Sequence, residues 1–203
     1  MLLFLIFYSS VTIYPDSEGY LDLAKRLSNF DVSNYNGLRS PGYPLLISFV
    51  NSNLYAVLFI QFGLGIVTSV FQYKTLVHFD FSKKNSLINT LFISSFLNVF
   101  FFETCILVET FVLFLMSAFV YLLSKTPFQN QNFRLDFLMS FILGYLVLIK
   151  SFYIFIPFLL IIWMVFNRPK FKSVYRKGVV ILIFTKIAFL RWSYVNKVNS
   201  GQF

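Results

Sequence analysis

The chain has 203 residues, of which 58% are hydrophobic, 21% are aromatic and only 12% are charged. This is more apolar surface than one soluble core of that length can bury, so we expect lipid to surround most of the chain. The net charge of +9 comes from basic residues that fall mainly in short segments between apolar runs. Because they form no continuous basic face, we expect no nucleic acid partner.

Cysteine and histidine content excludes two further kinds of site. Cys105 is the only cysteine and His78 the only histidine. An internal disulfide is therefore ruled out, and no Cys/His cluster has the spacing of a structural zinc site. We interpret Cys105 as a small apolar filler and His78 as an interfacial residue, and we expect neither a bound metal nor a cofactor.

Seven apolar runs predict an all-α fold, a polytopic transmembrane helix bundle that occupies residues 1–203 as one domain. The first run, residues 1–14, is short for a span and has no basic leader or cleavage site, so we do not interpret it as a signal peptide. The others are residues 54–73, 87–102, 106–124, 137–149, 152–166 and 179–192. We expect the fifth and sixth runs to form a tight hairpin through Lys150 and Ser151.

The distribution of Lys and Arg predicts the orientation. With the N-terminus in the cytoplasm, ten basic residues lie inside and four lie in outer segments, namely Lys25, Arg26, Arg39 and Lys197. We therefore expect a multi-pass protein of the cytoplasmic (inner) membrane, with residues 15–53 forming the longest external segment.

This external segment predicts one short helix that lies along the membrane interface. Tyr20, Leu23, Ala24 and Leu27 share one helical face, and charged residues occupy the other. Residues 29–36 are predicted to form a loop. The prolines at positions 41 and 44 disfavour helix for the residues that precede them, Ser40 and Tyr43.

Six charged residues from separate segments converge on the outer face in this topology. Charges close to lipid usually face a bundle interior or an aqueous cavity, so this face is the candidate site. Five of the six also have a purely structural interpretation. Asp16 with Ser17 would cap a helix, Arg39 would be a snorkelling cation and Glu103 a solvated loop charge. Glu109 and Lys150 would form an ion pair within the bundle. The six are Asp16, Glu18, Arg39, Glu103, Glu109 and Lys150.

Three glycines, Gly63, Gly65 and Gly144, are interpreted as close-packing points between helices.

The order of several motifs resembles the GT-C membrane glycosyltransferases, most closely the bacterial relatives of protein O-mannosyltransferases and lipid A aminoarabinose transferases. The motifs are Asp16-Ser17 before Tyr20 and Ala24, the run from Arg39 to Pro44 (RSPGYP), Glu109 at the start of an apolar helix, the stretch from Leu143 to Lys150, and the ending from Asn196 to Phe203. Where this chain has Lys150-Ser151, Arg-Pro is commoner in the family. The resemblance covers nearly the whole chain but only about the N-terminal half of a usual member. Both an active transferase and an inactive fragment are therefore expectations.

The resemblance implies transfer of a sugar from a polyprenyl phosphate donor to an acceptor glycan, lipid or protein at the outer membrane face. Asp16 matches the family's acidic residue that acts as general base, and such a transfer also needs fixed cations to stabilise the leaving phosphate. Arg39 and Lys150 are the candidate cations, and Glu18 and Glu109 are candidates for positioning hydroxyl groups. A divalent metal between Asp16 and Glu18 is chemically conceivable, but no full ligand set indicates one.

Two other classes share the same basic multi-span pattern. A polysaccharide polymerase or lipid-linked sugar flippase would have its essential polar residues along a central path. A non-catalytic membrane partner would need no essential carboxylate.

Overall fold

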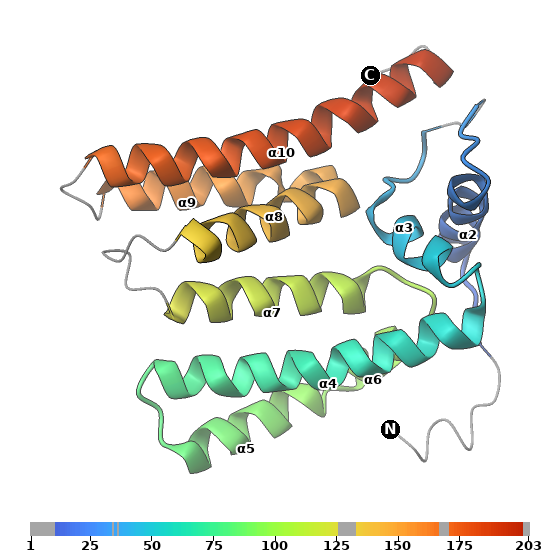
Figure 1. The fold of residues 1–203 in the computed structure, drawn as a ribbon. Coiled ribbons are helices and arrows are strands. Elements are labelled where there is room, and N and C mark those ends of the chain that lie inside the picture. The colour runs from blue at the N-terminus through green and yellow to red at the C-terminus, as the bar shows by residue number, and fades with distance from the viewer. Residues whose placement is uncertain (1–10, 34, 36, 126–132, 167–170, 201–203) are drawn as a thin grey trace. The chain divides into compact units, whose positions relative to one another are not determined.

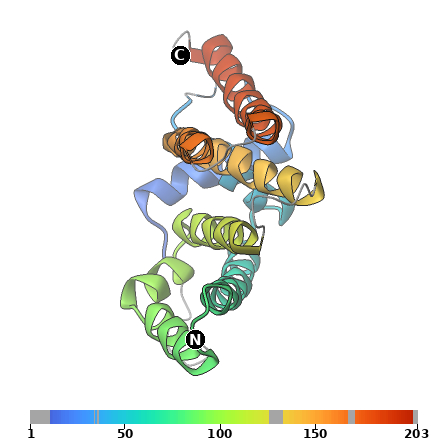
Figure 2. The same ribbon diagram turned by 90° about the vertical axis from the view of Figure 1, so that its left-hand side faces the viewer.

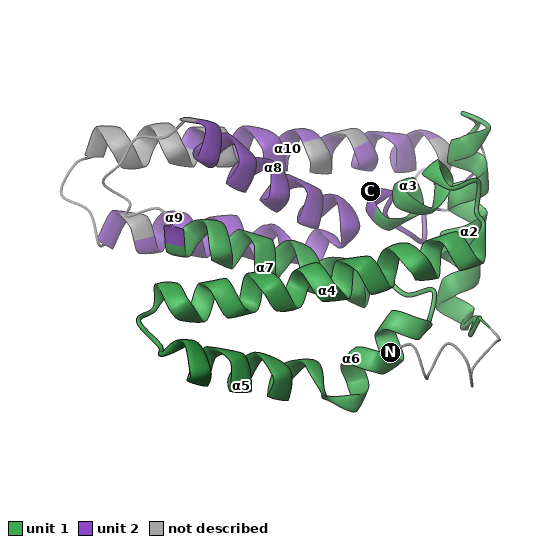
Figure 3. Ribbon diagram, turned by 60° about the horizontal axis from the view of Figure 1, so that its bottom comes forward, with its two compact units in different colours: residues 1–32, 43–124 green, residues 33–42, 125–203 purple. Residues whose placement is uncertain are grey.

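The computed structural model describes residues 11–33, 35, 37–125, 133–166 and 171–200. Helices dominate these residues, and the described part of the chain contains no β-strand beyond an isolated bridge between Thr12 and Cys105 (Figure 1). The all-α expectation is therefore confirmed. The chain divides into two compact units, residues 1–32 with 43–124 and residues 33–42 with 125–203 (Figure 3).

The described residues of unit 1 form six helices. They are α2 (Pro15–Ser28), most of α3 (Gly42–Phe49), α4 (Leu54–His78), α5 (Lys83–Ser94), α6 (Leu97–Thr104) and α7 (Glu109–Lys125). Both α5 and α6 pack against α4. Aromatic rings join α4 to α7, since Phe71 stacks on Tyr121 with centroids 5.2 Å apart.

Unit 2 holds α8 (Phe133–Ile149), the 3₁₀ turn η1 (Ser151–Ile154), α9 (Phe155–Phe166) and α10 (Phe171–Ser200). The long helix α10 packs along α8 and also contacts α9 (Figures 1 and 2). A Cβ added to Gly144 of α8 would lie 3.2 Å from backbone and side-chain atoms of Phe184 of α10. Gly144 is therefore a close-packing point, as predicted.

Helix α2 has the predicted amphipathic faces. Tyr20, Leu23 and Ala24 are buried, whereas Asp22 and Lys25 are exposed. Pro15 occupies the first turn, where its missing N–H costs nothing.

The expectation that Tyr43 is not helical is wrong. Tyr43 lies in α3, which begins at Gly42, so that Pro44 falls in the first turn. A first-turn proline removes only an N–H that has no partner within the helix, and helix is therefore tolerated there. Ser40 is non-helical, as predicted.

The apolar run at residues 87–102 is not one continuous helix. It is divided between α5 and α6, whose axes bend by 58° at the break. Ser95 ends α5, and its hydroxyl donates to the Phe92 carbonyl at 2.8 Å. A serine hydroxyl that bonds a nearby backbone carbonyl is a recognised cause of such a bend.

Some of the helices are long enough to cross a membrane. Within the described residues, α4 is long and apolar enough to cross a membrane, and the bent pair α5–α6 gives a second crossing if it is one span. The predicted first span falls mostly outside the described residues, and residues 11–14 are not helical. The tight connection through Lys150 and Ser151 is confirmed, since α8 ends at Ile149 and η1 begins at Ser151.

Candidate functional site

The first turn of α2 carries the predicted catalytic carboxylate. Asp16 and Glu18 are both exposed there, while Ser17 between them is fully buried. The backbone N–H of Tyr14 donates to the Ser17 hydroxyl oxygen at 3.0 Å. Tyr14 is the residue that precedes the helix, so Ser17 fixes the entry into α2 and holds its two acidic neighbours toward solvent. Negative charge is also favourable at this end of a helix.

The segment before α2 is held against the connection between α6 and α7. Thr12 forms a bridge with Cys105, the Ile106 N–H donates to the Thr12 carbonyl at 3.4 Å, and the rings of Tyr14 and Phe101 have centroids 5.7 Å apart. This connection leads directly to Glu109, the first residue of α7. The start of α2 and the start of α7 are therefore placed in one part of unit 1.

Tyr43 joins these two helix starts. Its ring meets Tyr20 of α2 edge-on at 5.2 Å and Phe111 of α7 at 6.5 Å. Burial raises the pKa of the Tyr43 hydroxyl well above its usual range, and the nearby Tyr20 and Glu109 raise it further. Tyr43 therefore stays protonated and can act only as a neutral hydrogen-bonding group.

Gln61 is the polar centre of this region and was not predicted. It is fully buried in α4, and its Oε1 accepts from the Tyr43 hydroxyl at 3.1 Å. Its amide nitrogen donates to the carbonyls of Phe102 at 3.1 Å and Cys105 at 2.9 Å. One side chain thus connects α3, α4 and the end of α6. The only signal in the sequence is an amide within an otherwise apolar stretch.

Glu103 is buried, so its interpretation as a solvated loop charge is wrong. It is 5% exposed, because α6 continues to Thr104 and packs on α4. Its carboxylate lies against Gly65, in the space that a Cβ at that position would fill. Gly65 is therefore a close-packing point, as predicted. Gly63 is not, since no heavy atom lies within 4 Å of a Cβ built there.

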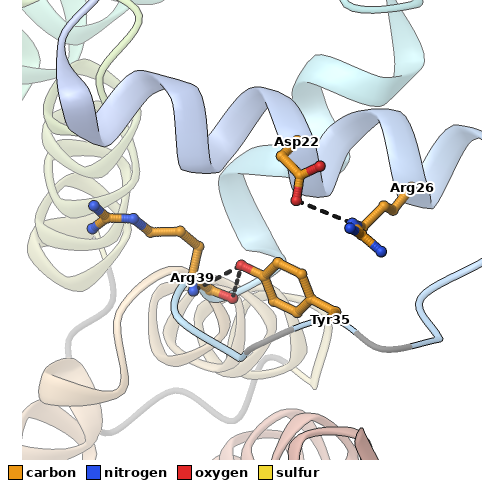
Figure 4. A network of polar contacts seen from close by, with 4 residues as sticks. All are labelled: Asp22, Arg26, Tyr35 and Arg39. Carbon is orange, nitrogen blue, oxygen red and sulfur yellow. Dashed lines mark hydrogen bonds and ion pairs between the residues drawn. The ribbon is translucent and has the colours of Figure 1, made fainter. Parts of the chain in front are cut away.

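Both predicted cations belong to unit 2. Arg39 lies in the segment before α3, and Lys150 is the single residue between α8 and η1. The backbone N–H of Arg39 donates to the Tyr35 hydroxyl at 2.8 Å. The Arg39 guanidinium extends away from the Tyr35 ring (Figure 4). Tyr35 is itself buried, and the centroid of its ring lies 6.0 Å from that of Trp192 of α10.

The same segment is anchored to the end of α8. The Tyr145 hydroxyl donates to the Gly42 carbonyl at 2.8 Å, and Gly42 packs on the backbone of Ile149. Ile149 directly precedes Lys150, and Gly42 follows Arg39 by three residues. Unit 2 therefore brings Arg39 and Lys150 to the same end of α8.

The five predicted site residues are thus divided between the units. Asp16, Glu18 and Glu109 lie in unit 1, and Arg39 and Lys150 lie in unit 2. Among the residues that the structure describes, no group of three or more His, Cys, Asp or Glu side chains is arranged to hold a metal ion.

Comparisons with protein-family models, with curated proteins and with solved structures found no match to the chain.

Proposed function

We propose that the chain is a membrane glycosyltransferase of the GT-C type, which moves a sugar from a polyprenyl phosphate to an acceptor at the outer face of the cytoplasmic membrane. The observation that carries this proposal is the anchoring of residues 37–42 on α8. It holds two cations, Arg39 and Lys150, at one helix end. Two fixed cations suit a lipid-linked phosphate, because charge-assisted hydrogen bonds compensate their removal from water.

The chemistry requires a base and a stabilised leaving group. An acceptor hydroxyl oxygen attacks the anomeric carbon of the donor sugar and gives its proton to the Asp16 carboxylate. The bond between the anomeric carbon and the phosphate oxygen breaks, and its electron pair leaves on the phosphate. Arg39 and Lys150 stabilise that developing charge. Glu18 and Glu109 accept hydrogen bonds from sugar or acceptor hydroxyls.

We also infer the seven-span topology with the N-terminus in the cytoplasm and residues 15–53 outside. Helix α4 has 25 residues, which at 1.5 Å per residue gives about 37 Å, longer than a hydrocarbon core of about 30 Å. Helices α7 and α8 have 17 residues each, or about 26 Å, the lower limit for a span. In this arrangement the polyprenyl chain lies against the Phe-rich helices.

Replacement of Asp16 by Asn tests the proposal. Asn keeps the size of Asp and its favourable position in the first helical turn but cannot take a proton, so turnover should fall on the order of 10² to 10⁴-fold. The measurement is sugar transfer from a polyprenyl phosphate donor by the purified protein in nanodiscs, with donor binding followed in parallel.

Asp80→Asn is the matched control. Asp80 has a φ of 63°, a conformation that Asn adopts as readily as Asp, and it lies far along the chain from every proposed site residue. Normal turnover by the Asp16→Asn variant, or an equal loss in the Asp80→Asn variant, would contradict the catalytic role.

A further inference from the structure

A groove runs along the C-terminal half of α2 in unit 1, separate from the residues of the proposed reaction. Its volume is about 590 Å³, within the range of small-molecule sites. One wall is a face of α2, and the other is the turn that joins α3 to α4. The lining residues are Leu21, Asp22, Lys25, Ser28, Asn29, Asn51, Ser52 and Leu54.

The groove is built on a fixed backbone. Asn51 and Ser52 both have left-handed φ angles, 51° and 58°. The Ser52 N–H donates to the Ile47 carbonyl at 3.1 Å, and the Asn51 N–H donates to the Ser48 carbonyl at 3.0 Å. These bonds hold two consecutive non-glycine residues in a conformation that is unfavourable for most side chains. Asn53 then caps α4 by accepting from the Ala56 N–H at 3.2 Å.

The opposite wall is also ordered. Arg26 forms an ion pair with Asp22 at 3.0 Å, which fixes the Asp22 carboxylate beside the groove (Figure 4). The Ser28 hydroxyl donates to the Ala24 carbonyl at 3.0 Å, so its oxygen faces outward only as an acceptor. Within the described residues, no protein group hydrogen-bonds the side chains of Lys25 and Asn29.

The lining selects the chemistry of the ligand. The lining supplies carboxylate, amide and hydroxyl oxygens as acceptors and ammonium and amide groups as donors, and it carries two charged groups, the Asp22 carboxylate, already paired with Arg26, and the Lys25 ammonium. A free phosphate would meet the Asp22 carboxylate, whereas a neutral sugar offers hydroxyls that both donate and accept. Leu21 and Leu54 supply apolar surface for the face of a sugar ring.

We propose that this groove binds a saccharide, and that it holds the non-reacting part of a saccharide acceptor. The second part of this inference rests on the proposed function. Asp22 lies four residues beyond Glu18 on the same face of α2, about 6 Å along the helix axis. A saccharide in the groove therefore extends to Glu18, which the proposed function assigns to positioning hydroxyl groups, and binding energy from its remote end orients the acceptor.

Binding of free saccharides to the purified chain in nanodiscs tests the groove directly. The probes are maltotriose, chitotriose and mannotriose, measured by saturation-transfer NMR and titration. At least one probe should bind, and Lys25→Ala and Asn51→Gly should each weaken it roughly three- to tenfold, the effect of one lost hydrogen bond. Glycine at position 51 keeps the left-handed backbone, so this variant removes only the side chain.

Lys84→Ala is the control, because Lys84 is an exposed lysine on α5, outside the groove. The groove assignment is overturned if no probe binds with a Kd below the order of 10 mM, if peptides bind in place of sugars, or if the control loses affinity equally. Saccharide binding through the groove without any sugar transfer would refute the proposed function alone. Transfer that is unaffected in KM for the acceptor by both groove variants would refute the groove alone.

Discussion

Replacement of Gly42 by Ala tests the anchoring of residues 37–42 on α8. A Cβ at position 42 would lie 2.6 Å from Ile149 Cγ1, 2.8 Å from its backbone nitrogen and 2.9 Å from its Cα. Two of these three atoms are backbone atoms, which cannot rotate out of the way. The segment must therefore move away from the end of α8.

The expected cost follows from two terms. Overpacking of a tight contact costs about 1–3 kcal/mol, and loss of the Tyr145 to Gly42 hydrogen bond, 2.8 Å long, costs about 1 kcal/mol. We therefore expect the free energy of unfolding to fall by about 2–4 kcal/mol. Tyr145→Phe removes only the hydrogen bond and should cost about 1 kcal/mol.

Gly63→Ala is a matched control that should raise, and not lower, the free energy of unfolding. Gly63 lies inside α4 with open space around its Cα, so alanine there meets nothing and favours the helix by about 1 kcal/mol. Unfolding should be followed by far-UV circular dichroism and by tryptophan fluorescence. Both tryptophans of the chain, Trp163 and Trp192, belong to unit 2, so fluorescence reports the unit that Gly42→Ala perturbs.

The result also bears on the cations. Because Arg39 precedes Gly42 by three residues, the displaced segment should carry Arg39 away from Lys150, and affinity for polyprenyl phosphate should fall. A Gly42→Ala variant as stable as the wild type, or stabilised to the extent of Gly63→Ala, would refute the anchoring.

Three further predictions concern the polar centre, the cations and the topology. Gln61→Leu should lower the free energy of unfolding by about 1–3 kcal/mol, because it removes the acceptor of the buried Tyr43 hydroxyl and the amide donor to the Phe102 and Cys105 carbonyls; an unchanged value would contradict the role of Gln61. Arg39→Gln and Lys150→Gln should each weaken polyprenyl phosphate binding in a folded preparation, and unchanged affinity in both would remove them from the site. A cysteine at Ser33 should react with an impermeant reagent from outside, and one at Lys84 only after permeabilisation; the reverse pattern would invert the topology.

Local patterns in the sequence predicted the helix α2 well. The alternation of apolar and charged residues at helical spacing places Tyr20, Leu23 and Ala24 on one face, and all three are buried. Such a pattern involves only a few consecutive residues and depends on no other part of the chain. The tight connection at Lys150 could be predicted for the same reason.

Element boundaries were harder to predict where side chains compete with the backbone. The proline at position 44 disfavours helix for Tyr43 only when the proline lies beyond the first turn, and the sequence does not say where α3 begins. The break near Ser95 depends on a serine hydroxyl that bonds the Phe92 carbonyl. Hydropathy alone describes this stretch as one apolar run.

Contacts between distant residues could not be predicted from one sequence. The Gln61 amide meets Cys105, 44 positions away, and Tyr43 meets Gln61 from 18 positions away. A polar residue in an apolar helix indicates that some partner exists, because an unsatisfied amide is costly in a buried environment. It does not indicate which helix supplies that partner.

Gly63 and Gly65 illustrate the same limit on a single helix. Two residues correspond to about 200° of helical rotation, so the two glycines face nearly opposite directions. Only Gly65 meets a neighbour, the Glu103 carboxylate of α6, while Gly63 faces open space. In a helix that is apolar on nearly all sides, periodicity does not distinguish the face that packs against another helix from the face that does not. The buried glutamate identifies that face, since its carboxylate fits only where the partner helix lacks a side chain.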